Sequence, residues 1–85
     1  DRYAASGEIN TQVSDPAAVI DAVAEHFAAS GATLDRLDGL TVDCGSWWFN
    51  LRPSNTEPLL RLNLEAADRA SCDDAVGTLL AQITS

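Results

Sequence analysis

Residues 47–66 read WWFNLRPSNTEPLLRLNLEA and contain two alternating apolar segments separated by a polar stretch. In the first segment Trp47, Phe49 and Leu51 occupy every second position. The second segment repeats this pattern with Leu60, Leu62, Leu64 and Ala66. Because alternation with period two places side chains on one face of a strand, the sequence predicts two strands that each have one buried face. The two strands are expected to pair as an antiparallel hairpin, with the polar stretch as its loop.

The polar stretch, residues 52–58, lies between the two strands and contains two prolines. Pro53 and Pro58 fix φ at two points, and with Glu57 we expect them to shape a short, rigid turn. The donors in this stretch are a guanidinium group, two hydroxyls and a carboxamide, from Arg52, Ser54, Thr56 and Asn55. Together with unpaired turn N–H groups, these donors suit a tetrahedral dianion such as phosphate. The alternative is an ordinary hairpin whose polar side chains only satisfy the backbone.

The string Arg-Pro-Ser-Asn-Thr-Glu-Pro at 52–58, followed by an apolar strand, resembles the phosphate-binding loop of the α-D-phosphohexomutases. This family includes bacterial phosphomannomutase/phosphoglucomutases and phosphoglucosamine mutases, and its loop lies in the fourth and last domain. The resemblance extends from about residue 6 to the C-terminus. It implies that Arg52, Ser54, Asn55 and Thr56 bind substrate phosphate. Because a carboxylate would repel a dianion, we expect Glu57 to bond to loop N–H groups or to Arg52.

The resemblance also implies a reaction. Phosphohexomutases interconvert hexose 1-phosphate and hexose 6-phosphate, with mannose or glucose as the sugar, through a bisphosphorylated intermediate. The nucleophilic serine, the Mg²⁺ site and the sugar-reading loop of the family belong to other domains, and their motifs are absent from these residues. We therefore expect this domain to contribute no catalytic residue, to bind no cofactor or metal, and to be inactive alone. Its expected partners are a hexose phosphate and the other domains of the same polypeptide, and the residues do not specify which hexose is used.

The composition limits the other classes of partner. The chain has 85 residues, which suffices for one small domain, and its formal charge of −8 argues against nucleic acid. No apolar run approaches the ~20 residues of a membrane span, so no membrane partner is expected. Cys44 and Cys72 lack the spacing of a zinc or redox motif and are expected to be reduced, buried thiols. With no export leader apparent, these features predict a cytoplasmic protein.

Two amphipathic helices flank the hairpin region. Asp15 followed by Pro16 indicates a helix start, and the apolar period predicts a helix over residues 16–30. Ser71 is expected to cap a second helix, with Asp74 three residues later as a shortened capping box. His26 lies on the flank of the first helix without an acidic partner at helical spacing, which indicates a surface position.

The remaining strands are expected at residues 8–13, 33–37 and 40–44, with turns at Asp38-Gly39 and Gly45-Ser46. This order predicts a two-layer α+β fold, in which an antiparallel sheet of four to five strands carries both helices on one face. The resemblance implies the same arrangement, a TATA-box-binding-protein-like C-terminal mutase domain. Residues 1–7 are expected to be a linker from a preceding domain, and residues 8–85 the phosphate-binding domain.

The residues alone also allow a second function. A non-enzymatic interaction or regulatory domain would use the hairpin and the sheet face that carries Trp48 to bind protein. The donor set of the loop is the feature that separates the two hypotheses.

Overall fold

The computed structural model describes residues 3–84. Within this range the chain forms one antiparallel sheet and two helices. The strands are β1 (Ala4–Ala5), β2 (Ile9–Gln12), β3 (Thr33–Asp35), β4 (Leu40–Asp43), β5 (Trp47–Pro53) and β6 (Leu59–Ala66). The helices are α1 (Pro16–Ala29) and α2 (Arg69–Thr84). The predicted two-layer α+β class is confirmed, and neither helix in the described range is long and apolar enough to cross a membrane.

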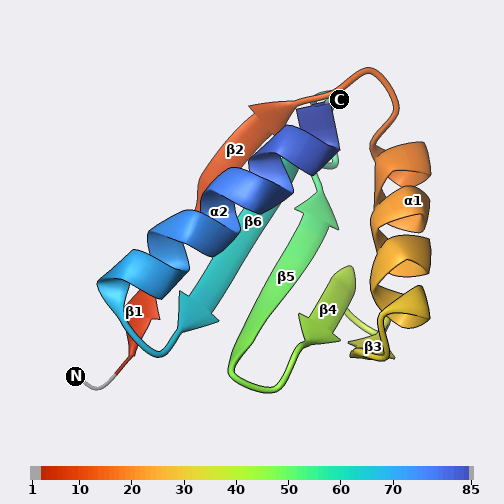
Figure 1. Cartoon of the computed structure of the whole chain (residues 1–85). Coiled ribbons are helices and arrows are strands. Elements are labelled where there is room, and N and C mark those ends of the chain that lie inside the picture. Colours follow the sequence, from red (N-terminus) through yellow and green to blue (C-terminus); the bar gives the residue numbers. More distant parts are fainter. Residues whose placement is uncertain (1–2, 85) are drawn as a thin grey trace.

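The sheet order is β1-β6-β5-β4-β3, and β2 pairs with β6 on the same edge as β1. Helix α1 carries the chain from this edge to β3 at the other edge, and the strands then return as a meander to β6. Both helices lie on the same face of the sheet, with α2 over β6 and α1 beside β3 and β4 (Figure 1). The outer face of the sheet carries no helix within residues 3–84.

The core lies between the sheet and the helices. The predicted alternation is confirmed: Phe49 and Leu51 of β5 and the alternate residues of β6 are buried, whereas Trp48 and Arg52 are exposed on the outer face. Helix α1 buries Ile20, Val23, Ala24 and Phe27, and helix α2 buries Cys72, Leu79 and Ile83. The strand period therefore divides β5 into a core face and a face that is free to carry a site.

Strand β1 lies within the segment expected to be a linker and brings the strand number to six rather than four or five. Strand β2 pairs only with residues 59–62 of β6, which leaves the C-terminal part of this eight-residue strand without a partner. Ala4 and Ala5 pair there with Ala66 and Glu65. Ser6 bridges the gap between β1 and β2, since its Oγ accepts the Leu64 N–H at 2.9 Å. The division of the chain into a linker and a domain stays a prediction.

The expected Ser71 cap of the second helix is wrong. Helix α2 begins at Arg69, before Ser71, and the carboxylate of Asp68 accepts the backbone N–H of Ser71 at 2.7 Å. Asp68 is thus the N-cap, and Ser71 occupies the third helical position. The first helix was predicted correctly, because Asp15 accepts the Ala18 N–H at 3.2 Å and Pro16 is its first residue.

We expect acid to fray the start of α2. The hydrogen bonds from Ser71 lower the pKa of Asp68, so this carboxylate stabilises the helix above its ordinary unfolded pKa of about 4, and the stabilisation is lost as pH falls through the lower folded pKa. The substitution Asp68→Ala should therefore accelerate amide exchange at residues 69–72 at neutral pH, as measured by NMR. The control Asp74→Ala removes the same charge without removing the cap. Equal rates of amide exchange in the Asp68→Ala and Asp74→Ala variants would show that Asp68 does not stabilise the start of α2.

Candidate functional site

The polar loop spans residues 54–58, because β5 ends at Pro53 and β6 begins at Leu59. Backbone hydrogen bonds hold both of its ends. The N–H of Ser54 donates to the carbonyl of Leu59 at 3.0 Å, and the N–H of Val13 donates to the carbonyl of Pro58 at 2.9 Å. The second bond ties the loop to the chain that follows β2. The loop is therefore anchored at its start to β6 and at its end to the segment after β2, and not within the hairpin alone.

Two further hydrogen bonds lie inside the loop. The N–H of Thr56 donates to Ser54 Oγ at 3.3 Å, and the N–H of Leu59 donates to the Glu57 carbonyl at 2.8 Å. In the described range no residue other than glycine has a positive φ, so Asn55 has ordinary backbone geometry. An asparagine is thus not needed here for a left-handed turn, and its carboxamide is left free to bind a ligand.

The contacts expected for Glu57 are not formed. Within residues 3–84 its carboxylate makes no hydrogen bond or ion pair, and only its backbone carbonyl contributes to the turn. Arg52 pairs instead with Asp38, whose Oδ1 lies 3.7 Å from Arg52 Nε. Both side chains are more than half exposed, so this ion pair contributes little stability. The guanidinium group keeps its remaining N–H donors available to a ligand.

The β3–β4 loop, residues 36–39, supports Arg52, a contact that the sequence pattern did not predict. Asn50 lies two residues before Arg52 on the same face of β5, and its Nδ2 donates to the Asp38 carbonyl at 2.8 Å and to Thr41 Oγ1 at 3.0 Å. Asn50 thereby holds Asp38 beside Arg52. The sequence pattern already placed Asn50 and Arg52 on the same face of a strand. It did not predict that both would contact Asp38, which lies 12 residues before Asn50.

Gly39 lies in the same loop and packs directly against the backbone and side chain of Arg52. Its φ is +68°, and a Cβ at this position would lie 2.5 Å from Arg52 Cγ and 2.7 Å from the Leu51 carbonyl oxygen. Both the conformation and the close approach require glycine.

We therefore expect Gly39→Ala to lower the free energy of unfolding by roughly 1–3 kcal/mol and to weaken anion binding by displacing Arg52. Urea unfolding measures the first effect and a phosphate titration the second. The matched control is Gly77→Ala within α2, where an added Cβ meets nothing within 4 Å. That substitution should raise stability by about 0.5–1 kcal/mol, since alanine is the better helix former. Equal effects of the two substitutions would contradict the role of Gly39.

Arg61 of β6 lies directly opposite Arg52 in the β5–β6 register, and both side chains are exposed on the outer face. Arg61 makes no hydrogen bond or ion pair within the described residues. Like charges at facing positions of an antiparallel pair repel each other, unless an anion lies between them. The register of the hairpin therefore places a second guanidinium group beside the loop.

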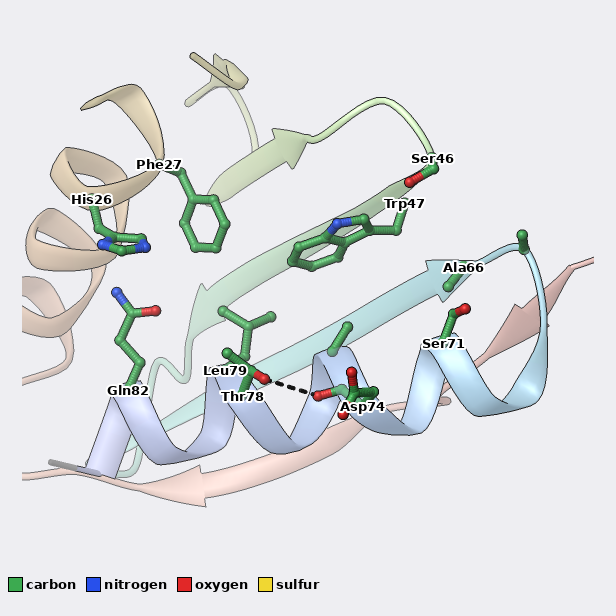
Figure 2. A pocket seen from close by; sticks show the side chains of 12 residues that line it. His26, Phe27, Ser46, Trp47, Ala66, Ser71, Asp74, Thr78, Leu79 and Gln82 are labelled. Atoms are coloured by element: carbon green, nitrogen blue, oxygen red, sulfur yellow. Dashed lines mark hydrogen bonds between the residues drawn. The ribbon is translucent and has the colours of Figure 1, made fainter. Parts of the chain in front are cut away.

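A separate hollow lies on the helix side of the sheet. This space has a volume of about 440 Å³. Figure 2 shows side chains that line it, among them Phe27, Trp47 and Leu79. Its edge carries polar side chains that include His26, Ser71, Asp74, Thr78 and Gln82. Trp47 and Arg52 lie on opposite faces of β5, so this hollow and the loop belong to different sides of the sheet.

The described residues do not fit a Mg²⁺ site. Across residues 3–84 no three His, Cys, Asp or Glu side chains are grouped in a way that could hold a metal ion. His26 is exposed and contacts the edge of the Phe27 ring, with 5.0 Å between the ring centroids. Cys72 is fully buried, whereas Cys44 is only partly buried, and both are free thiols. The expectation of two buried cysteines is therefore correct for Cys72 and wrong for Cys44.

The fold and the loop define a class of protein: a small two-layer α+β domain whose central hairpin presents an Arg-Pro-Ser-Asn-Thr-Glu-Pro loop at one end of its open face. The model of one protein family, described as "Phosphoglucomutase/phosphomannomutase, C-terminal domain", matches residues 8–80. The chain belongs to this family.

Curated relatives agree with the family assignment. The chain is 49% identical over 75 residues to a phosphomannomutase of Methanocaldococcus jannaschii, covering 88% of this chain and 16% of the relative. It is 52% identical over 64 residues to a phosphomannomutase of Salmonella typhimurium, covering 75% and 14%. A protein of Xanthomonas campestris named phosphohexose mutases is 47% identical over 70 residues, covering 82% and 16%. The chain thus spans about a sixth of the length of these relatives.

Proposed function

We propose that this domain binds the non-reacting phosphate of a hexose phosphate in a mutase that interconverts hexose 1-phosphate and hexose 6-phosphate. The observation that carries the proposal is the gathering of donors at one end of the hairpin. Arg52 ends the outer face of β5, Ser54, Asn55 and Thr56 follow it in the loop, and the chain anchors the loop at both ends. Charge-assisted hydrogen bonds from such a fixed set stabilise a tetrahedral dianion.

Arg61 extends this donor set. A phosphate group near the loop would have a guanidinium group on each of the two facing strands, which converts the repulsion between Arg52 and Arg61 into attraction for the ligand. The domain is acidic as a whole, with a formal charge of −8, so distant charges oppose an anion. Salt screens those distant charges beyond ~10 Å and leaves the local arginines dominant.

The donors of the loop also suit what the proposed reaction requires. In a mutase that proceeds through a bisphosphorylated sugar, the intermediate turns over between two half-reactions, so the same loop must accept phosphate from either end of the sugar. Donors directed at a symmetric anion meet this requirement, whereas donors directed at sugar hydroxyls would not. The names of the curated relatives favour mannose phosphates, and the described residues contain no sugar-reading motif.

The rest of the reaction would depend on other domains of the same polypeptide. They would supply the phosphoryl-transferring serine and the Mg²⁺ that aids the transfer, because the residues here fit neither role. We therefore expect the 85-residue chain to turn over no hexose phosphate. Conversion of mannose 1-phosphate to mannose 6-phosphate by the isolated chain would contradict this. The comparisons give no support to a non-enzymatic interaction domain.

The test is an NMR titration of the chain with inorganic phosphate, mannose 1-phosphate and mannose 6-phosphate, with unphosphorylated mannose as the control. We expect the amide signals of residues 52–57 to shift with all three phosphates and not with mannose. Binding should be weak, with a dissociation constant on the order of millimolar, because one loop supplies few contacts. It should also weaken from pH 7.5 to pH 5, since the second pKa of a phosphate monoester is about 6 and the dianion is lost.

Three outcomes decide the proposal. Loop signals that do not move with any phosphate would refute it. The variant Arg61→Gln should weaken phosphate binding several-fold without moving the core signals, whereas unchanged affinity would limit the site to Arg52 and the loop. Shifts that spread over Trp48 and its neighbours instead of the loop would favour an interaction domain.

A further inference from the structure

A second hollow lies on the outer face of the sheet, at the end of β5 far from the loop. It encloses about 210 Å³, and its lining includes three aromatic residues and two acidic ones: Tyr3, Trp47, Trp48, Asp43 and Glu65. Trp48 is 39% exposed and Tyr3 is 59% exposed. Among the described residues, Leu37 is the one other large hydrophobic side chain with such exposure. Two of these three side chains therefore gather at one place, which is unlike the usual scatter of exposed apolar residues.

The register of the sheet produces this arrangement. Trp48 of β5 pairs with Asp43 of β4 on one side and with Glu65 of β6 on the other. All three side chains point to the outer face, because their sequence neighbours Val42, Phe49 and Leu64 are buried. Facing residues on adjacent strands have Cβ atoms about 4.5–5.5 Å apart. The indole ring thus has a carboxylate on each side within reach of one bound group.

The two carboxylates form no ion pair within the described residues. Glu65 makes no hydrogen bond or ion pair there, and Asp43 uses Oδ1 to accept the Gly45 N–H at 2.8 Å, which fixes its position. Three of the described arginines pair with other acids: Arg36 with Asp21, Arg52 with Asp38 and Arg69 with Asp73. The fourth, Arg61, is four residues from Glu65 on the same strand, about 13 Å away.

The charge of Asp43 acts on its surroundings. Burial raises the pKa of the neighbouring Cys44 thiol, and the negative charge of Asp43 raises it further. A cation in the hollow would therefore meet a negative potential as well as two aromatic rings.

We propose that this hollow binds the guanidinium group of an arginine side chain that another protein segment presents to the outer face of the sheet. A guanidinium group is planar, stacks on an indole ring and donates hydrogen bonds to carboxylates at its edges. Trp48 provides one ring, Asp43 and Glu65 provide two carboxylates, and Tyr3 adds a second ring. This proposal does not depend on phosphate binding at the loop, which lies at the other end of β5.

Size and charge favour a side chain over a free small molecule. The space of about 210 Å³ is smaller than the ~300 Å³ or more of pockets that enclose drug-sized ligands, so it accommodates the end of one side chain. Free arginine carries an α-ammonium and an α-carboxylate group, and both would lose hydration beside the sheet. An arginine within a peptide carries the guanidinium charge alone and suits the site better.

The test is an NMR titration of the full chain with N-acetyl-arginine amide. We expect shifts of the Trp48 indole N–H and of the Asp43 and Glu65 amides, with a dissociation constant on the order of 10 mM, as suits a single side chain. N-acetyl-citrulline amide has the same shape without the charge and should cause no shift. Free arginine and N-acetyl-lysine amide should bind several-fold more weakly. Equal binding of citrulline, free arginine or lysine would overturn the proposal.

Variants distinguish binding in the hollow from general attraction of a cation to the acidic surface. Glu65→Gln and Trp48→Ala should each weaken binding by about fivefold or more, whereas Glu25→Gln, which removes an exposed acid on α1, should not. Arg52→Ala should also leave this binding unchanged, which keeps the test independent of the phosphate site. Arg2 lies outside the described residues and next to Tyr3 in the sequence, so the titration is repeated with Arg2→Gln, which should bind at least as tightly. Unchanged affinity in both Glu65→Gln and Trp48→Ala, with intact core signals, would refute the proposal.

Discussion

Replacing Arg52 with alanine in the proposed full-length mutase is expected to lower kcat/KM for mannose 1-phosphate, the proposed substrate, about 100-fold. Arg52 ends the outer face of β5, and Asn50 and Asp38 hold the loop that lies beside it. If the guanidinium group donates two charge-assisted hydrogen bonds to the substrate phosphate, their loss costs about 3 kcal/mol, which corresponds to roughly two factors of ten. Steady-state kinetics of the purified variant measure this effect, and thermal unfolding shows whether the variant is folded.

The lysine variant is the control for charge. Arg52→Lys keeps the cation but loses the planar fork of donors, so we expect it to recover only part of the lost kcat/KM. Asp38→Asn should have a smaller effect, because the ion pair between Asp38 and Arg52 is long and exposed. Wild-type kinetics in a folded Arg52→Ala variant would refute phosphate binding by this residue.

The second large effect concerns stability. Phe49→Ala is expected to lower the free energy of unfolding of the 85-residue chain by about 3–5 kcal/mol. Phe49 is fully buried, and its ring centroid lies 5.2 Å from that of Phe27 and 5.6 Å from that of Trp47. Its removal would leave a cavity where β5 meets α1. A domain of this size has only ~5–15 kcal/mol of stability, so this one substitution would remove a substantial part of it.

Urea unfolding followed by circular dichroism measures this effect, and the next residue along β5 is its control. Trp48→Ala removes a larger aromatic side chain from the outer face, where 39% of the residue is exposed, and should cost less than Phe49→Ala by at least about 2 kcal/mol. A similar loss of stability in both variants would contradict the assignment of one core face to β5.

The local pattern of the sequence predicted most of the architecture. Alternation in β5 and β6 needs no tertiary information, since it follows from the period of a strand, and the apolar stripe of α1 likewise follows from the period of a helix. The end of β3 was placed two residues too late, because the carboxylate of Asp35 accepts the Leu37 N–H at 2.8 Å and turns the chain there. Such a local turn competes with strand pairing.

The cap of α2 shows why helix boundaries were less certain. Asp68 and Ser71 are both residues that favour N-cap positions, and they are three residues apart. The sequence offers no ground for choosing between them. The choice depends on where β6 ends and where Arg69 finds its partners, the Ala5 carbonyl and Asp73.

The loop residues Arg52, Ser54, Asn55 and Thr56 were recognised from the sequence because their order is continuous and their donor chemistry is explicit. Their role in phosphate binding remains a prediction. The surroundings of the loop were not recognised. The contacts of Asp38 and Gly39 with Arg52 depend on the packing of the β3–β4 loop, and the facing pair Arg52 and Arg61 depends on the register of the hairpin.

The sequence by itself determined the two layers, the buried face of each major strand and the family of the domain, because periodicity and a contiguous motif are properties of neighbouring residues. Only the tertiary structure decided that Ala4 and Ala5 complete the edge of β6, that two arginines face each other beside the loop, and that Trp48 lies between two carboxylates. These features arise from pairing between segments far apart along the chain, and the free energy of that pairing depends on the whole sheet.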